Sequence, residues 1–396
     1  MDIKFVSRER RARRVCVVVG TRPEIIKMAP VVKELSRRGV PFFILHAGQH
    51  YSFNMDRQFF EDLELPAPLH HLEEVRRHTT HASQTAEMMR GIEDVLFKER
   101  PSVVLVCGDA NACFSGAVAA RKLGLVVGHI EAGLRSHDWR MSEEHNRVMI
   151  DHISELLFAP TERARQNLLK EGVNGEISVT GNTVVDASLE HVEIARGKSR
   201  ILESTGLEPG YILLTMHREE NVDDYLNLRS VLEAMRRISR RFADLPIIFP
   251  AHPRTVKRIG QFGLGDELKR PGTLRLLAPV GYLDFLMLLV NAGAVLTDSG
   301  GIQEEACVLR VPCVTMRENT ERPESIEVGG NILAGTSPEG ILVALGQMLG
   351  KKRDWANPFG DGKTAERIVR AVDCVLKESG GIPCRRRMDK AMEARI

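Results

Sequence analysis

The stretch LTDSGGIQEEA, residues 296 to 306, contains one strand-to-helix unit of the kind from which the class of fold can be predicted. It joins an apolar run at 294–296, typical of a buried strand, to a helical pattern at 302–309. Between them, Ser299, Gly300 and Gly301 form a turn with little side-chain bulk at a helix N-terminus, where free backbone N–H groups can bind an anion. Such a turn is also a common structural corner, with acidic residues placed well against the helix dipole. The stretch alone leaves both interpretations open.

The same strand-to-helix order recurs along most of the chain. Most strand candidates are apolar on both faces, which is typical of buried parallel strands. They are RVCVVVG, PFFILHAG, SVVLVCGD, LVVGHIEAG and ELLFAPT in the first half, and YILLTMH, LPIIFPAH, TLRLLAP, GAVLTDS and VPCVTMR in the second. Helical patterns between them include 23–35, 80–97, 226–242 and 281–290. The alternation predicts an α/β protein with parallel sheets.

The length of 396 residues favours two domains. The pattern breaks at the charged helical stretch 183–200, which is followed by LESTGLEPG. We therefore predict an N-terminal domain at 1–185 and a C-terminal domain at 186–363. A last helix is predicted at about 364–380, and one option is that it packs back on the first domain. Ligands of such sheets bind outside the carboxyl ends of the strands, so two facing domains would form a central cleft.

Composition excludes several classes of function. A net charge of +2 gives no global basic field for nucleic acid, and the basic clusters near both ends are interpreted as solvated tails. No apolar run reaches the ~20 residues of a membrane span. Seven cysteines without paired CxxC spacing predict free thiols in the cytoplasm and no zinc site. The missing G-x-G-x-x-G fingerprint argues against NAD or FAD.

Carboxylates gather after the strands of the first half. Asp109 and Glu131 each follow a strand, and the segment SEEHNRVMIDH brings Glu143, Glu144, Arg147 and Asp151. A spacing of four allows Glu143 and Arg147 to pair on one helix face. For a single carboxylate, a cap or a surface ion pair is the competing interpretation. Three carboxylates directed to one sheet edge favour chemistry.

The strand ends of the second half carry basic residues and histidines. His217 and Arg218 follow one strand, and His252 follows the next. Another strand leads to a polar group that comprises Arg317, Glu318, Arg322 and Glu324. Histidines, arginines and a Gly-Gly helix start suit a diphosphate, whereas the carboxylates of the first half suit proton transfer to a sugar.

Taken together, these motifs resemble the non-hydrolysing UDP-N-acetylglucosamine 2-epimerases. The resemblance covers residues 15–375 and rests on GTRPEIIKMAP, GHIEAGLRS, EEHNR, GNTVVDA, HREE, TDSGGIQEEA and TERPE, which occur in family order. It implies two Rossmann-like domains in a GT-B arrangement, usually in a homodimer. It further implies reversible conversion of UDP-N-acetylglucosamine to UDP-N-acetylmannosamine through a glycal, with no metal or nicotinamide cofactor.

The resemblance also implies roles for individual residues. Arg22 and Lys27 would contact the nucleotide sugar, and Asp109, Glu131 and Glu143 would be the catalytic carboxylates. His217, near the diphosphate, would be both a catalytic and a substrate-binding residue. The other implied nucleotide-site residues are Phe285 near the uracil, Ser299, Gly300 and Gly301 at the phosphate, Glu305 at the ribose hydroxyls, and Arg317. The AGQHYSFNMD stretch implies a second, regulatory UDP-sugar site through Gln49 and His50.

Three positions depart from the family pattern: Ala110, Ser142 and Val280 stand where a threonine, a proline and a polar residue are usual. They bear on sugar and regulatory details more than on the reaction class. The alternatives that stay open are a hydrolysing epimerase, an epimerase of a modified UDP-sugar, a GT-B glycosyltransferase and a nucleotide-sugar-binding regulator.

Overall fold

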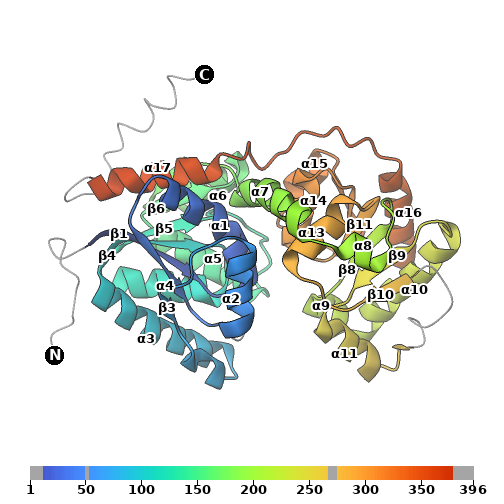
Figure 1. Ribbon diagram of the computed structural model, residues 1–396, viewed down its shortest axis with the longest axis horizontal. Helices are drawn as coiled ribbons and strands as arrows, with labels where there is room; N and C mark the ends of the chain where they lie inside the picture. Colours follow the sequence, from blue (N-terminus) through green and yellow to red (C-terminus); the bar gives the residue numbers. More distant parts are fainter. Residues whose placement is uncertain (1–11, 50–52, 266–273, 378–396) are drawn as a thin grey trace. The chain divides into compact units, whose positions relative to one another are not determined.

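The computed structural model describes residues 12–49, 53–265 and 274–377 (Figure 1). The chain divides into two compact units. The first unit comprises Met1–Ala187 and Gly360–Ile396, and the second comprises Ser188–Phe359. Each unit is built around its own parallel sheet, which confirms the predicted fold class of two α/β domains.

The first unit has a seven-stranded sheet in the order β3-β2-β1-β4-β5-β6-β7. Its strands are β1 (Ala12–Val19), β2 (Phe42–His46), β3 (His70–His71), β4 (Pro101–Cys107), β5 (Val126–Ile130), β6 (Leu156–Ala159) and β7 (Glu176–Val179). Every neighbouring pair in this sheet is parallel, so all the strands end at one edge.

Helices cover both faces of this sheet. They are α1 (Arg22–Arg37), α2 (Phe53–Asp62), the 3₁₀ turn η2 (Glu74–Arg77), α3 (His81–Glu99), α4 (Asn111–Lys122), α5 (Ser142–Ile153), α6 (Glu162–Glu171) and α17 (Thr364–Lys377). Cys16 and Val18 of β1 pack with buried residues of α3 and α4. Helices α1 and α17 lie side by side (Figure 1), where α1 contacts β1 and β4, and α17 contacts β4. Distant parts of the sequence therefore share one layer.

The second unit has a six-stranded sheet in the order β10-β9-β8-β11-β12-β13. Its strands are β8 (Ile212–Thr215), β9 (Ile247–Pro250), β10 (Leu274–Leu277), β11 (Ala294–Thr297), β12 (Cys313–Thr315) and β13 (Asn331–Leu333). Its helices are α8 (Ile201–Thr205), α9 (Glu219–Val222), α10 (Tyr225–Arg241), α11 (Pro253–Gln261), α13 (Tyr282–Val290), α14 (Gly300–Val308), α15 (Pro323–Glu327) and α16 (Pro338–Leu349). The boundary between the units falls inside α7 (Thr183–Lys198).

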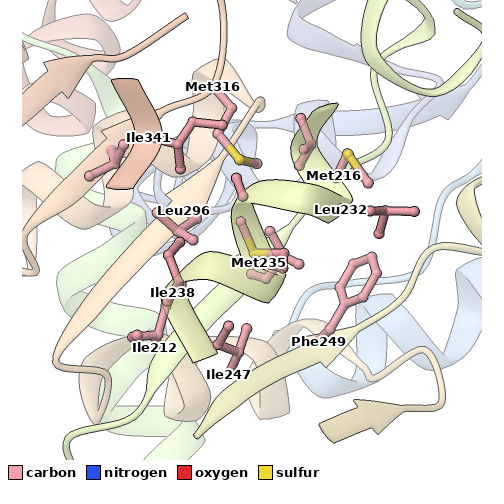
Figure 2. Packing of buried hydrophobic residues seen from close by; sticks show 14 of the residues in the cluster. Ile212, Met216, Leu232, Met235, Ile238, Ile247, Phe249, Leu296, Met316 and Ile341 are labelled. Carbon is pink, nitrogen blue, oxygen red and sulfur yellow. The ribbon is translucent and has the colours of Figure 1, made fainter. Parts of the chain in front are cut away.

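The alternation of side chains along β8 explains why this sheet is covered on both faces. Ile212 and Leu214 pack with α10 and α16 in the core shown in Figure 2. Leu213, between them, packs with α13 and α14 in a second core. Because successive side chains of a strand point to opposite faces, an uninterrupted apolar run requires a helical layer on each side.

The structure adds elements that the sequence patterns did not predict. The strands β3, β7 and β13 were missed, because they are two to four residues long and their side chains are largely half-buried. Helix α14 begins at Gly300, two residues before the predicted start. In the part of the chain that is described, none of the helices is long and apolar enough to cross a membrane.

Candidate active site

The first unit places Asp109 and Glu131 just beyond the carboxyl ends of β4 and β5, which are neighbours in the sheet. Glu131 has a φ of +70°, a left-handed conformation that is uncommon for a residue with a side chain. Gly108 has a φ of +83°, and a Cβ atom there would lie 3.2 Å from Glu131 Oε2. The loop before Asp109 therefore passes close to the Glu131 carboxylate.

Lys27 and Glu131 form a close ion pair. Lys27 Nζ lies 2.7 Å from both Glu131 Oε1 and Oε2, and the Glu131 side chain is only 2% exposed. Asn182 Nδ2 donates to Glu131 Oε1 at 3.2 Å. Two donors from α1 and from the loop before α7 thus fix the orientation of this carboxylate.

Arg147 of α5 holds the second candidate carboxylate. Its Nη2 lies 2.6 Å from Asp109 Oδ2, and its Nη1 also pairs with Glu144. On its own helix, Arg147 thus contacts Glu144, whereas the sequence spacing had indicated Glu143. Backbone donors from Ser136 and His137 bond Glu144 as well. Burial raises the pKa of Glu144, but these donors and Arg147 outweigh it and leave the pKa below its ordinary value.

The remaining predicted residues of this unit lie around the same loops. Glu143 is half-buried in the first turn of α5 and accepts a hydrogen bond from the Ser142 hydroxyl at 3.2 Å. Arg22 begins α1, with its guanidinium over the Phe59 ring. Gln49 Oε1 accepts from the backbone N–H of Ala112 at 3.0 Å, at the start of α4. His50 lies outside the described residues, so the regulatory site stays a prediction.

In the second unit, Ser299 is the N-cap residue of α14, and Gly300 and Gly301 are the first two residues of the helix. A Cβ atom at Gly301 would meet no other atom within 4 Å, whereas one at Gly300 would lie 2.6 Å from Glu321 Oε1. A side chain at Gly300 would therefore displace the Glu321 carboxylate, whereas Gly301 leaves open space at a helix N-terminus that suits an anion.

Asp298 organises the turn that carries His217. This fully buried carboxylate accepts from the backbone N–H groups of His217 and Arg218, each at 3.0 Å, and from Asn221 Nδ2 at 3.2 Å. His217 Nδ1 also lies 3.3 Å from Asp298 Oδ1. Burial raises the pKa of Asp298, but the bonds from His217 and the backbone outweigh burial and lower it below the ordinary value.

The two histidines that follow β8 and β9 are neighbours, as their equivalent sequence positions indicated. The ring centroids of His217 and His252 lie 5.8 Å apart. His252 Nδ1 accepts from the backbone N–H of Arg254, so it caps α11. Burial and the positive charge of nearby groups lower the pKa of His252. The His217 side chain is 42% exposed, which leaves it able to reach a ligand.

Arg317 is held by acidic and polar side chains. Its Nε donates to Glu220 at 2.9 Å, its Nη1 to Glu321 at 3.0 Å and its Nη2 to Asn319 at 3.2 Å. The Arg317 side chain is only 1% exposed. Burial raises the pKa of Glu321, but Arg322, Arg317 and Arg218 lower it well below its ordinary value. Arg317 therefore fixes the loop after β12.

Glu305 and Phe285 lie on the two helices that cover one face of this sheet. Glu305 is on α14 and accepts from the Tyr282 hydroxyl at 2.9 Å. Burial and the nearby Glu305 charge raise the pKa of Tyr282 well above its ordinary value. Phe285, on α13, packs against the core between that helix and the sheet.

Comparisons with known proteins agree with this geometry. The family model described as UDP-N-acetylglucosamine 2-epimerase matches residues 33–373. The chain belongs to the UDP-N-acetylglucosamine 2-epimerase family. This is a family of isomerases, as the resemblance in the sequence implied.

Two curated relatives and one solved structure illustrate the range of the epimerase family. The chain is 50% identical over 363 residues to the UDP-N-acetylglucosamine 2-epimerase of Methanocaldococcus jannaschii, covering 91% of this chain and 98% of the relative. It is 39% identical over 361 residues to a UDP-2,3-diacetamido-2,3-dideoxy-D-glucuronate 2-epimerase of Pseudomonas aeruginosa, covering 90% and 98%. The crystal structure of the M. jannaschii enzyme, in complex with UDP-GlcNAc and UDP, has a TM-score of 0.84 and covers 91% of this chain and 99% of its own, with 50% identity. It belongs to the GT-B type of fold.

Sequence reasoning assigned no role to several residues of this epimerase fold that hold the site together. Asp298, Asn182, Tyr282 and Glu321 were missed as partners of candidate site residues. Asp298 and Asn182 lie inside the quoted motifs TDSGGIQEEA and GNTVVDA, so the motifs were the available signal. Over the described ranges, no group of three or more His, Cys, Asp or Glu side chains could hold a metal ion.

Proposed function

We propose that this chain catalyses the reversible C2 epimerisation of UDP-N-acetylglucosamine to UDP-N-acetylmannosamine without hydrolysis. The observation that carries the proposal is the pair Asp109 and Glu131 at adjacent strand ends, each held by a cation. Positioned carboxylates of this kind are suited to moving a proton at carbon. Membership of the epimerase family and 50% identity to an enzyme of that name support the substrate.

The second unit would bind the nucleotide. The N-terminus of α14, with Ser299 and the open space at Gly301, suits the diphosphate because its free N–H groups point outward. His217 would contact the diphosphate, and Asp298 would keep the imidazole oriented. Glu305 would accept from the ribose hydroxyls, with Phe285 near the uracil. The solved structure of the M. jannaschii relative holds UDP-GlcNAc and UDP, which supports a UDP-sugar as the ligand.

The reaction proposed for the first unit explains why several carboxylates are needed. The C2 hydrogen of the sugar is not acidic until the bond between C1 and the diphosphate oxygen breaks. UDP then leaves with the electron pair, and the oxocarbenium character at C1 makes the C2 proton removable. Its loss to a carboxylate forms the C1=C2 bond of a glycal. Protonation of the opposite face of C2 and re-addition of UDP to C1 give the epimer.

Asp109, Glu131 and Glu143 are the groups we assign to these proton transfers and to the cationic ring. Lys27 and Arg147 would keep two of them in fixed positions, since each is in direct contact with its carboxylate. Arg22 and Lys27 would also contact the sugar nucleotide. Fixed charges of this kind stabilise a developing charge without reorganising during the reaction.

The test is incubation with UDP-N-acetylglucosamine in deuterated water, followed by NMR. We expect UDP-N-acetylmannosamine with solvent deuterium at C2. Free UDP and free N-acetylmannosamine in equal amounts would instead identify a hydrolysing epimerase. A GT-B glycosyltransferase would leave C2 unlabelled and would require an acceptor.

The identity of the sugar is tested in the same experiment. A 39% identical relative is named for a diacetamido uronic acid, so this modified UDP-sugar is the informative competitor. Faster deuterium uptake from it than from UDP-N-acetylglucosamine would change the assigned substrate and keep the reaction type. Absence of label with both sugars would refute the proposed function.

The setting of the enzyme is part of the same proposal. We place it in the cytoplasm as a homodimer without a metal or nicotinamide cofactor, supplying nucleotide sugars for polysaccharide synthesis. The free thiols of Cys16, Cys107, Cys113, Cys307 and Cys313, all buried, support a reducing compartment. Light scattering on the purified protein tests the dimer, and activity after extensive chelation tests the absence of a metal requirement.

A further inference from the structure

His129 is a fully buried histidine beside the candidate active site, and the proposed chemistry gives it no role. It lies in β5, two residues before Glu131. Its Nδ1 is 2.6 Å from Asp151 Oδ1, and its Nε2 is 2.9 Å from the carbonyl oxygen of Gly108. Both ring nitrogens therefore face an oxygen atom.

The partners of the ring determine its protonation state. A carbonyl oxygen only accepts hydrogen bonds, so Nε2 must carry a proton to bond Gly108. On the other side, Asp151 Oδ2 is 3.0 Å from the backbone nitrogen of Gly133 and 2.8 Å from Arg135 Nη2. Two donors, one of them cationic, favour the ionised carboxylate, which also only accepts. Nδ1 must then carry a proton as well.

The surrounding charges balance a buried imidazolium. Arg135 contacts both Asp151 and Glu171, at 2.8 and 2.6 Å. Negative and positive groups thus alternate from Glu171 through Arg135 and Asp151 to His129. Because the two cations are matched by two carboxylates, burying the ring in its charged form leaves no unpaired charge.

This pair connects the backbone segments that carry the three candidate carboxylates. Gly108, bonded by the ring, directly precedes Asp109, and its own N–H donates to Ile130, next to Glu131. Gly133, bonded by Asp151, follows Glu131 by two residues. Asp151 itself lies on α5, the helix that carries Glu143 and Arg147.

We propose that His129 carries a proton on both ring nitrogens and that, with Asp151, it positions the segments bearing Asp109, Glu131 and Glu143. It is a positioning residue, because it acts through Gly108 and Asp151. The effect on catalysis rests on the proposed function, whereas the protonation state does not. The left-handed backbone at Glu131 adds a reason for such a restraint, since strained conformations of residues with a side chain persist only where their surroundings hold them.

The protonation state is tested on the wild-type protein with ¹⁵N-labelled histidine. The spectrum of the His129→Gln variant identifies the His129 signals. We expect both ring nitrogens to show the shift of protonated imidazolium nitrogen at neutral pH. A signal of unprotonated nitrogen at neutral pH would overturn the proposal. This measurement requires no activity, so it gives an answer even if the proposed reaction fails.

The positioning role is tested by His129→Gln and Asp151→Asn. Gln can still donate to Gly108 but carries no charge. We expect kcat to fall about 10²-fold, as small misplacements of reacting groups do, while KM and UDP affinity stay near wild type. Leu96→Ala is the matched control: Leu96 is fully buried in α3 of the same unit, so this change lowers stability and should leave kcat unchanged.

A double variant tests whether His129 and Asp151 act as one unit or affect kcat independently. If the two side chains act as one unit, His129→Gln combined with Asp151→Asn loses little more kcat than either single change. Near-normal kcat in both single variants would overturn the positioning role. If Leu96→Ala lowers kcat as much as His129→Gln does, the positioning role is also overturned, because lower stability alone would then explain the effect.

Discussion

The two units carry the same kind of sheet but very different side chains at its carboxyl edge. In the first unit, Asp109 and Glu131 stand at adjacent strand ends with Arg147 and Lys27 against them. In the second, the corresponding edge presents His217 and the glycine start of α14. One edge is built from paired carboxylates and cations, and the other from backbone donors and an imidazole.

The parallel sheet thus supplies the position of each site, and the residues after each strand supply its chemistry. The carboxylate edge is suited to moving protons, and the helix N-terminus is suited to holding a phosphate. Turnover and nucleotide affinity should therefore depend on different edges. Substitutions at the first edge should change mainly kcat, and those at the second should change mainly the binding of UDP.

The largest effect is expected at the carboxylate edge. Asp109→Asn, Glu131→Gln and Glu143→Gln should each lower kcat about 10²–10⁴-fold, which is typical for loss of a positioned acid or base. UDP affinity, measured by calorimetry, should stay near wild type. Glu162→Gln, an exposed carboxylate in the same unit, is the control and should be neutral. Near-normal turnover in all three variants would show that the proposed site is misplaced.

A smaller effect is expected at Asp298, which organises the second edge. Asp298→Asn removes the charge that accepts from His217 and Arg218, so we expect the free energy of unfolding to fall by about 1.5–3 kcal/mol. UDP affinity should fall with it. Asp224→Asn is the matched control, because Asp224 caps α10 and Asn caps a helix equally well. If UDP binds Asp298→Asn as tightly as wild type, Asp298 does not organise the nucleotide site.

Substitutions at Gly301 and Gly300 should have different effects although the two residues are adjacent. Gly301→Val extends into open space, so the fold should tolerate it, while a bound diphosphate should not. We expect a loss of about 1.4–2.8 kcal/mol of binding energy, roughly 10- to 100-fold in UDP affinity, with unchanged circular dichroism. Gly300→Ala should instead lower stability, because its Cβ atom would contact Glu321. Unaltered UDP binding by Gly301→Val would return this turn to a purely structural role.

Arg317 and Glu305 of the second unit test whether its side chains, and not only the glycine turn, contribute to nucleotide binding. Arg317→Ala and Glu305→Ala should chiefly weaken UDP binding, with kcat less affected. Because Arg317 is buried among Glu220 and Glu321, its removal should also reduce stability, so thermal unfolding is measured beside calorimetry. A change confined to kcat in either variant would contradict the division between the two edges.

The smallest effect concerns acid stability. The pKa values of Asp298 and Glu321 are lowered in the folded state from ordinary values of 3.8 and 4.5. Depressed carboxyl pKa values contribute stability that is complete above the ordinary values and is lost as pH falls through the folded ones. The free energy of unfolding should decrease less in Glu321→Gln than in the wild type as pH falls below about 4.5. The expected difference is on the order of 1–2 kcal/mol, measured by denaturant titration. Glu339→Gln, an exposed carboxylate of the same unit, should follow the wild-type curve.

Much of the fold and part of the candidate site could be predicted from the sequence, because their signals are local. Apolar runs such as Val15–Val19 and 103–107 predicted strands that are buried on both faces. The turn at Ser299 predicted a helix start with exposed donors, and this start is observed. Asp109 and Glu131 were expected to lie near each other, because they follow two strands whose carboxyl ends share an edge.

Other features could be decided only by the tertiary structure, because they depend on residues far apart in the chain. Lys27 and Glu131 are 104 positions apart, and His217 and Asp298 are 81 apart, so no local pattern links them. The strands β3 and β13 are too short to have a period and exist because a neighbouring strand bonds them. Charge alone could not choose between Glu143 and Glu144 as the partner of Arg147. The backbone donors of Ser136 and His137, in the loop before α5, reach Glu144, and the fold of this loop determined which carboxylate is buried beside the arginine.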